Sequence, residues 1–150
     1  EGLVVVGWYH SHPIFPPDPS GVDVDNQGNY QRLFWDEEAK ASPFVGFIVS
    51  PYDQGLKGRE SCVKTFYVQP MDGEPTAFLV EYEVSDEGLD EADVERMLGA
   101  VLEAAVAPAK FEPLEMWRTD AKGPCTKLAK MRASLGATLK RCTESGEQAE

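Results

Sequence analysis

Short apolar stretches, separated by proline, glycine and charged residues, divide the first 85 residues of the chain. Residues 3–9 form an apolar run rich in β-branched and aromatic residues, which predicts a buried strand. Residues 44–50 predict a second strand, buried on both faces. Residues 62–68 and 77–84 predict two more strands, and the turn-forming residues 71–75 between them predict a hairpin.

Helical patterns mark three further segments, residues 23–36, about 90–108 and about 124–142. The buried side of the first helix is expected to come from Val24, Leu33 and Phe34. Strands that alternate with flanking helices predict the α/β class with a mixed sheet.

The last predicted helix combines an apolar stripe with basic residues. Its stripe is expected to pack in the core or against another helix, with a partner subunit as the alternative. A solvated face is the more common reason for the basic residues, and contact with nucleosomal DNA or an acidic partner stays open. The stripe comprises Leu128, Met131, Leu135 and Leu139, and the cations are Lys122, Lys127, Lys130, Arg132, Lys140 and Arg141.

The two histidines of the chain, His10 and His12, are separated by one residue. Side chains alternate along a strand, so both imidazoles should project to one side while Ser11 points away. Pro13 cannot continue a central ladder and should end the strand. Asp23 follows in the first turn of the predicted helix. Two imidazoles and one carboxylate suit a catalytic zinc, which takes three protein ligands and leaves one position open for water.

A structural reading of the same residues is also available. Ser20 and Asp23 fit a capping box, with Ser20 as N-cap and Asp23 as the third helical residue. Histidines near a strand end are often hydrogen-bonded structural residues. One metal site explains His10, His12 and Asp23 together, and the capping role of Ser20 is compatible with it.

The order His10-Ser11-His12-Pro13, then Ser20 and Asp23, resembles the motif of the JAMM (MPN+) zinc metalloproteases, which remove ubiquitin or related modifiers. The similarity extends over residues 1–70 and fades beyond residue 85. It looks most like the Myb-SWIRM-MPN histone deubiquitinase subgroup. The flanking matches are residues 5–9, Gln27, Tyr30, Gln31 and residues 49–52.

The resemblance implies an MPN fold, with a mixed sheet flanked by helices, and one catalytic Zn²⁺ held by His10, His12 and Asp23. It also implies that Ser20 donates a hydrogen bond to the oxyanion of the tetrahedral intermediate. The family uses a glutamate general base on an earlier strand, and Glu1 is the sole carboxylate before His10. We therefore expect an N-terminally truncated chain that lacks the first helix and strands of the fold. A relic metal site without full catalysis is the alternative.

The composition changes near residue 85, which predicts three regions. Residues 1–85 are expected to form the C-terminal portion of the JAMM/MPN catalytic core. Residues 86–143 are expected to be a helical extension of the same domain, and residues 144–150 a disordered tail.

The net charge of −12 argues against broad or sequence-specific nucleic-acid binding, because phosphate contacts need a basic face. Steering toward a basic partner and a merely solvated acidic surface both fit this charge. No apolar run approaches the ~20 residues that cross a membrane, so no membrane partner is expected. The three cysteines are widely spaced, which predicts reduced thiols and an intracellular location, in the nucleus or cytoplasm.

Two functions of different classes follow. The first is a zinc-dependent isopeptidase that removes ubiquitin or a ubiquitin-like modifier from protein lysines, with histones and chromatin among the expected targets. The second is a non-catalytic MPN scaffold or interaction module, which the missing glutamate favours. A zinc hydrolase for another amide substrate is a third, weaker reading. Related MPN domains pair through helices, so an MPN partner subunit is a further expectation.

Overall fold

The computed structural model describes residues 4–83, 92, 95, 96, 99 and 112–146. The chain divides into two compact units, Glu1–Tyr82 and Glu83–Glu150. The first unit contains four strands and a helix, and the described part of the second contains a hairpin and a helix, α3.

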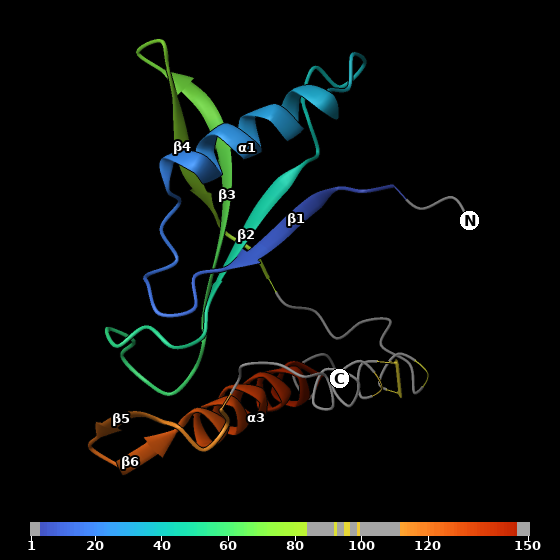
Figure 1. The fold of residues 1–150 in the computed structure, drawn as a ribbon. Coiled ribbons are helices and arrows are strands. Elements are labelled where there is room, and N and C mark those ends of the chain that lie inside the picture. The colour runs from blue at the N-terminus through green and yellow to red at the C-terminus, as the bar shows by residue number, and fades with distance from the viewer. Residues whose placement is uncertain (1–3, 84–91, 93–94, 97–98, 100–111, 147–150) are drawn as a thin grey trace. The chain divides into compact units, whose positions relative to one another are not determined.

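A four-stranded sheet forms the first unit, in the order β1-β2-β3-β4 (Figure 1). The first pair is parallel and the other two pairs are antiparallel, so the sheet is mixed. The α/β class with a mixed sheet is therefore confirmed. The strands are β1 Gly7–Ser11, β2 Val45–Ser50, β3 Cys62–Met71 and β4 Glu74–Val80.

Strand β1 begins later than the apolar run predicted. It pairs with β2 from Gly7 opposite Val45 to Ser11 opposite Val49, and forms one edge of the sheet. Residues 4–6 precede the strand and are exposed, and Tyr9 within the strand is 81% exposed, so the prediction of a buried strand over residues 3–9 is wrong in its first half and at Tyr9. Hydrophobicity alone could not locate the start, because pairing with β2 defines it.

The predicted hairpin joins β3 and β4, with a tighter turn than expected. Met71 pairs with Glu74, which leaves only Asp72 and Gly73 between the strands. Both have positive φ, 54° and 87°. A two-residue turn with two positive φ values matches the right-handed twist of the strands, and Asp-Gly is a favoured sequence for it.

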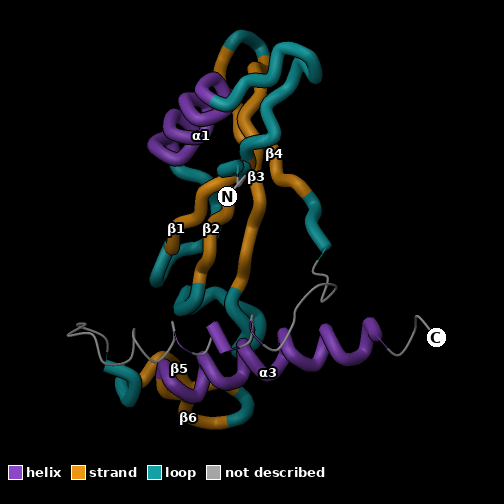
Figure 2. The backbone as a smooth tube through the Cα atoms, turned by 90° about the vertical axis from the view of Figure 1, so that its right-hand side faces the viewer, coloured by secondary structure: helices purple, strands orange, loops and turns teal. Residues whose placement is uncertain are grey.

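Helix α1, Gly21–Leu33, lies against one face of the sheet and contacts β2, β3 and β4 (Figure 2). Its buried residues are Asp23, Gln27 and Gln31. Leu33 is exposed, so its predicted place on the buried side is wrong. The buried side is polar because the helix supplies hydrogen bonds to the sheet rather than an apolar stripe.

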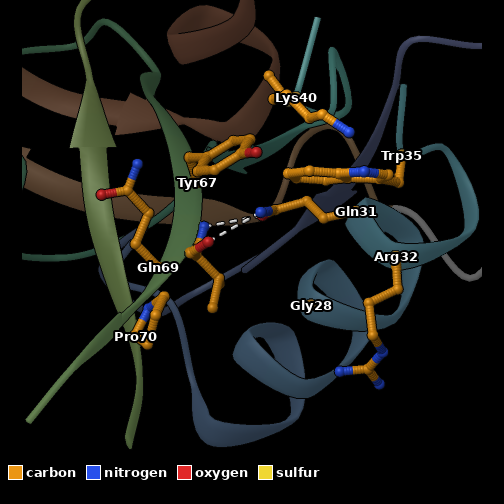
Figure 3. Close-up of a pocket in the computed structure, with 10 residues that line it drawn as sticks. Gly28, Gln31, Arg32, Trp35, Lys40, Tyr67, Gln69 and Pro70 are labelled. Atoms are coloured by element: carbon orange, nitrogen blue, oxygen red, sulfur yellow. Dashed lines mark hydrogen bonds between the residues drawn. The ribbon is translucent and has the colours of Figure 1, made fainter. Parts of the chain in front are cut away.

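At one corner of the sheet, the side chain of Gln31 makes the backbone hydrogen bonds that a neighbouring strand would otherwise make. Extended by two residues beyond Gly46 and Phe66, the β2–β3 register would set Phe44 opposite Val68, but β2 begins at Val45. Instead, Gln31 Nε2 donates to the Val68 carbonyl and Gln31 Oε1 accepts from the Val68 N–H, both at 2.8 Å (Figure 3). Val68 belongs to the buried core of this unit with Ile48 and Phe66.

The described part of the second unit contains a hairpin that the sequence patterns did not predict. Strands β5, Met116–Asp120, and β6, Gly123–Thr126, pair before helix α3, Lys127–Gly146. The predicted start of this helix at Pro124 is therefore wrong. The Thr126 hydroxyl accepts a hydrogen bond from the N–H of Ala129 in the first turn.

Lys130, on α3, is completely buried, with its Nζ 5.8 Å from the centroid of the Trp117 ring. This position contradicts a solvated basic face for Lys130. Nearly all of the helix predicted over residues 90–108 lies outside the described residues. Within the described part of the chain, no helix combines the length and apolar content needed to span a membrane.

Candidate metal centre

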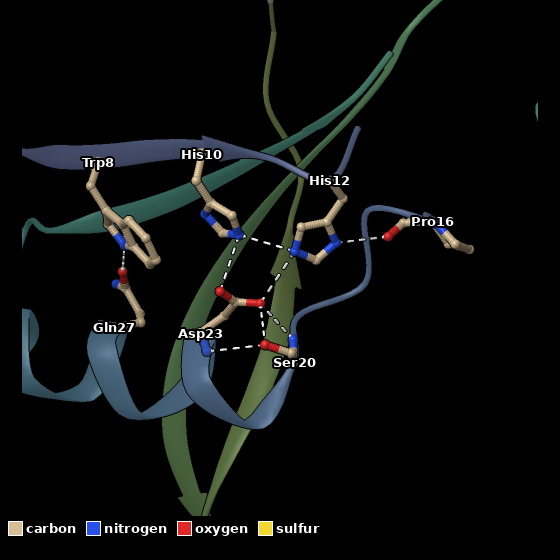
Figure 4. A network of polar contacts seen from close by, with 7 residues as sticks. All are labelled: Trp8, His10, His12, Pro16, Ser20, Asp23 and Gln27. Atoms are coloured by element: carbon tan, nitrogen blue, oxygen red, sulfur yellow. Dashed lines mark hydrogen bonds and ion pairs between the residues drawn. The ribbon is translucent and has the colours of Figure 1, made fainter. Parts of the chain in front are cut away.

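The end of β1 and the start of α1 bring three potential metal ligands together (Figure 4). His10 lies on β1, His12 follows the strand, and Asp23 lies in the first turn of α1. The two Nε2 atoms are 3.1 Å apart. His10 Nε2 lies 3.1 Å from Asp23 Oδ1, and His12 Nε2 lies 3.4 Å from Asp23 Oδ2. The predicted alternation of the strand therefore places both imidazoles on one side.

The two imidazole rings are held differently. His12 Nδ1 lies 2.9 Å from the Pro16 carbonyl oxygen, which can only accept, so Nδ1 is the donor in this bond and Nε2 is the nitrogen directed toward Asp23. Its backbone N–H donates to the Val49 carbonyl at 2.9 Å. The Nδ1 atom of His10 is buried and has no hydrogen-bond partner among the described residues. The His10 ring instead stacks on Trp8, with centroids 4.7 Å apart and planes inclined by 15°.

Asp23 is a capping residue as well as a candidate ligand. Its N–H donates to the Ser20 hydroxyl, while Ser20 N–H and Oγ–H donate to Asp23 Oδ2 at 2.8 and 2.6 Å. The predicted capping box is thus present. Burial raises the pKa of Asp23, but the bonds from Ser20 and the nearby His10 and His12 lower it, and the net pKa lies below the ordinary value. Asp23 is therefore an ionised carboxylate at neutral pH.

The donor set fits a divalent metal ion. Ligand atoms about 2.0–2.2 Å from a tetrahedral ion lie about 3.3–3.6 Å from one another, close to the 3.1–3.4 Å separations among His10, His12 and Asp23. Among the described residues, these three form the one group of histidine, cysteine and carboxylate side chains that could hold a metal ion. A bound cation would neutralise the ionised Asp23 carboxylate on which the two imidazoles converge.

The proline-rich loop after His12 is fixed beside this centre. The Pro13 carbonyl accepts from Tyr52 N–H at 3.0 Å, and the Phe15 carbonyl accepts from the Ser50 hydroxyl at 2.5 Å. Asp18 forms an ion pair with Lys64 of β3. These contacts fix the loop that carries the Pro16 carbonyl bonded to His12.

Trp8 and Gln27 also belong to the site, and the sequence patterns did not identify their contact. The Trp8 indole N–H donates to Gln27 Oε1 at 2.7 Å. A signal was present in the spacing, because Asp23, Gln27 and Gln31 recur every four residues and so share one helix face. Glu1 lies outside the described residues.

A separate cavity of about 730 Å³ lies near the C-terminal end of α1 (Figure 3). Gln31, Trp35 and Tyr67 are among the residues that line it, and none of the metal-ligand candidates is. The cavity is therefore distinct from the metal centre.

Parts of the chain are similar to known proteins. Residues 1–36 match the family model described as JAB1/Mov34/MPN/PAD-1 ubiquitin protease. Human "Deubiquitinase MYSM1" is 53% identical over 54 residues, which cover 36% of this chain and 6% of that protein. The MYSM1 protein of Xenopus laevis, whose name describes it as a histone deubiquitinase, is 51% identical over 54 residues, with the same coverage of each chain. A zebrafish (Danio rerio) "MPN domain-containing protein" is 34% identical over 143 residues, covering 90% of this chain and 30% of that protein.

The chain thus spans only a small part of these curated relatives. Its mixed sheet and the matched segment define the class: the chain carries an MPN (JAMM) domain. Within this class, the domain is related to that of the deubiquitinase MYSM1.

Proposed function

We propose that this chain is part of a zinc-dependent isopeptidase that removes ubiquitin, or a ubiquitin-like modifier, from protein lysines. The observation that carries the proposal is the convergence of His10 Nε2, His12 Nε2 and the Asp23 carboxylate within 4.8 Å of one another. Similarity to proteins named as deubiquitinases supports the reaction class.

His10, His12 and Asp23 would hold the zinc ion. When bound, zinc would supply a water of lowered pKa and polarise the scissile carbonyl. The low pKa of Asp23 keeps this ligand ionised without a proton to displace. The bond from His12 Nδ1 to Pro16 leaves Nε2 free to coordinate.

Ser20 is the proposed donor to the developing oxyanion. Its hydroxyl donates to Asp23 Oδ2, so it must turn away from the carboxylate to reach a substrate oxygen. The bond from Ser20 N–H to the same Oδ2 can hold Asp23 during that rotation. A positioned donor of this kind contributes about 3–4 kcal/mol to barrier reduction.

The proposed substrate is a ubiquitinated protein, and a histone is the proposed target because the Xenopus relative is named a histone deubiquitinase. The same relative supports a nuclear location for this chain. The net charge of −12 favours association with a basic protein over nucleic acid.

A metal-binding scaffold is the second candidate. Among the described residues, Asp23 is the only carboxylate in the metal-ligand grouping, and Asp18 is already paired with Lys64. A scaffold would retain the metal without hydrolysing an isopeptide. A partner MPN subunit would fit either function.

The decisive experiment measures Zn²⁺ affinity and cleavage of a fluorescent ubiquitin–lysine isopeptide by this chain and by any longer natural form. His12→Ala should abolish both, because it removes a ligand. Ser11→Ala is the matched control, since the exposed Ser11 lies between the two histidines in sequence and should leave both unchanged. Cleavage by metal-free His12→Ala would refute the isopeptidase, and zinc binding without cleavage in every form would favour the scaffold.

A further inference from the structure

The His10 ring is connected to the interior of the domain through Trp8. One face of the indole stacks on His10, and the indole N–H donates to Gln27 Oε1 at 2.7 Å (Figure 4). Trp8 also packs edge-on against Phe66 of the core, with ring centroids 6.4 Å apart. The Tyr30 ring lies against the indole as well, with centroids 5.7 Å apart, so one polar and two aromatic contacts hold the indole beside His10.

Gln27 is completely buried, and both ends of its amide are used. Its Nε2 donates to Gln31 Oε1 at 2.9 Å and to the Phe44 carbonyl at 2.8 Å. Gln31 in turn bonds to both backbone groups of Val68. A fully satisfied buried network fixes the position of each member, because any shift would leave a polar atom without a partner.

A glycine makes room for this amide. Trp8 pairs with Gly46 across β1 and β2. A Cβ added at Gly46 would lie 2.5 Å from Phe66 Cε1 and 3.0 Å from Gln27 Oε1. The absent side chain at Gly46 thus leaves the space in which Gln27 reaches the indole.

The two histidines need different means of orientation. The Pro16 carbonyl fixes the ring of His12 through Nδ1. His10 has no such bond among the described residues, although its Nδ1 is buried. The ring also contacts His12 and Asp23 on its Nε2 side, and the stacked indole is the contact that lies parallel to its plane.

We propose that Trp8 and Gln27 are positioning residues of the metal centre. Gln27 anchors the indole of Trp8, and the indole holds the His10 ring with Nε2 directed toward Asp23. This role rests on the metal-binding function proposed above, because a positioned His10 ring matters only if His10 is a ligand. The ring geometry that it describes can be tested without metal.

The first test is NMR of the metal-free chain. The stacked indole should shift the His10 ring-proton resonances upfield, and Trp8→Leu and Gln27→Met should move them toward those of an unstacked histidine. Trp8→Phe, which keeps an aromatic face and is the variant least disruptive to folding, should retain part of the shift. Ile48→Val is the matched control, because Ile48 is a buried core residue opposite His10 in the β1–β2 register.

The second test is Co²⁺ affinity, followed by the ligand-field absorption of the bound ion. Trp8→Leu and Gln27→Met should weaken binding about 10–100-fold, the range for residues that orient a metal ligand. Trp8→Phe should weaken it less, and Ile48→Val should leave it unchanged. Failure of the unaltered chain to bind Co²⁺ or Zn²⁺ would refute the metal function, while the NMR shifts would still decide the positioning role. Variants that match Ile48→Val in both measurements would overturn the proposal.

Discussion

The sequence patterns predict an apolar buried side for both α1 and α3, but the structure buries polar or charged residues of each helix. Helix α1 has no apolar stripe and buries Asp23, Gln27 and Gln31, each hydrogen-bonded. Helix α3 has an apolar stripe, yet Leu135 is 61% exposed while Lys130 is fully buried. The comparison teaches that the partner surface decides which helix face is buried.

The physical reason differs between the two helices. Helix α1 covers a corner of the sheet where Val68 and Phe44 present backbone groups that need partners, so amide side chains are favoured there. Helix α3 follows a hairpin that presents Trp117, and the stem of Lys130 can pack with this ring while its charge interacts with the aromatic face.

Gln31→Leu should break the polar face of α1 and have the largest effect. It would leave the buried N–H and C=O of Val68 without the bonds from Gln31, which should lower the free energy of unfolding by about 2–4 kcal/mol. Urea unfolding followed by circular dichroism measures this change. The control Asn26→Leu, at an exposed position of the same helix, should stay within about 0.5 kcal/mol of the unaltered chain. Equal effects would mean that the Gln31 bonds contribute nothing specific.

Lys130→Ala should test the buried cation of α3 and have an intermediate effect. Removal of its buried stem should cost about 1–3 kcal/mol in the stability of the second unit. Tryptophan fluorescence of a chain in which Trp8 and Trp35 are replaced by phenylalanine reports on this unit during urea unfolding, because the remaining Trp117 lies beside Lys130. The exposed Lys122 supplies the control, and Lys122→Ala should change little. If both substitutions had the same small effect, the burial of Lys130 would have no energetic importance.

Replacing the glycines within the two helices by alanine should have the smallest effect and should raise the free energy of unfolding. No atom lies within 4 Å of a Cβ added at Gly28 of α1 or Gly136 of α3. Gly28→Ala and Gly136→Ala should each add about 0.5–1 kcal/mol, because alanine loses less backbone entropy on forming a helix. Thermal unfolding of each single variant measures the gain. A loss of stability at Gly28 alone would indicate that α1 cannot accept a methyl group at that position.

Much of the first unit could be predicted from local patterns. The alternation around His10 and His12 and the capping box at Ser20 are short-range features, and both appear in the structure. The three proposed metal roles remain predictions. The parallel pairing of β1 with β2 brings Trp8 beside Gly46, and no local pattern could predict the contact of the indole with Gln27.

The hairpin of the second unit was harder to predict from the sequence, and the reason lies in its residues. Residues 116–126 contain arginine, aspartate, lysine, glycine and proline, which interrupt the alternation of a normal strand signal. The turn requires a positive φ of 94° at Gly123, which marks a hairpin only once the pairing of β5 with β6 is known. The burial of Lys130 likewise depends on Trp117, which lies outside the helix pattern.

The bonds between Gln31 and Val68 have a consequence for hydrogen–deuterium exchange. The amide proton of Val68 belongs to a strand but is held by a side chain of α1. Its protection should therefore be lost whenever the helix detaches, even while the neighbouring β-ladder stays closed. A single backbone amide would then report how firmly the helix that carries Asp23 is seated.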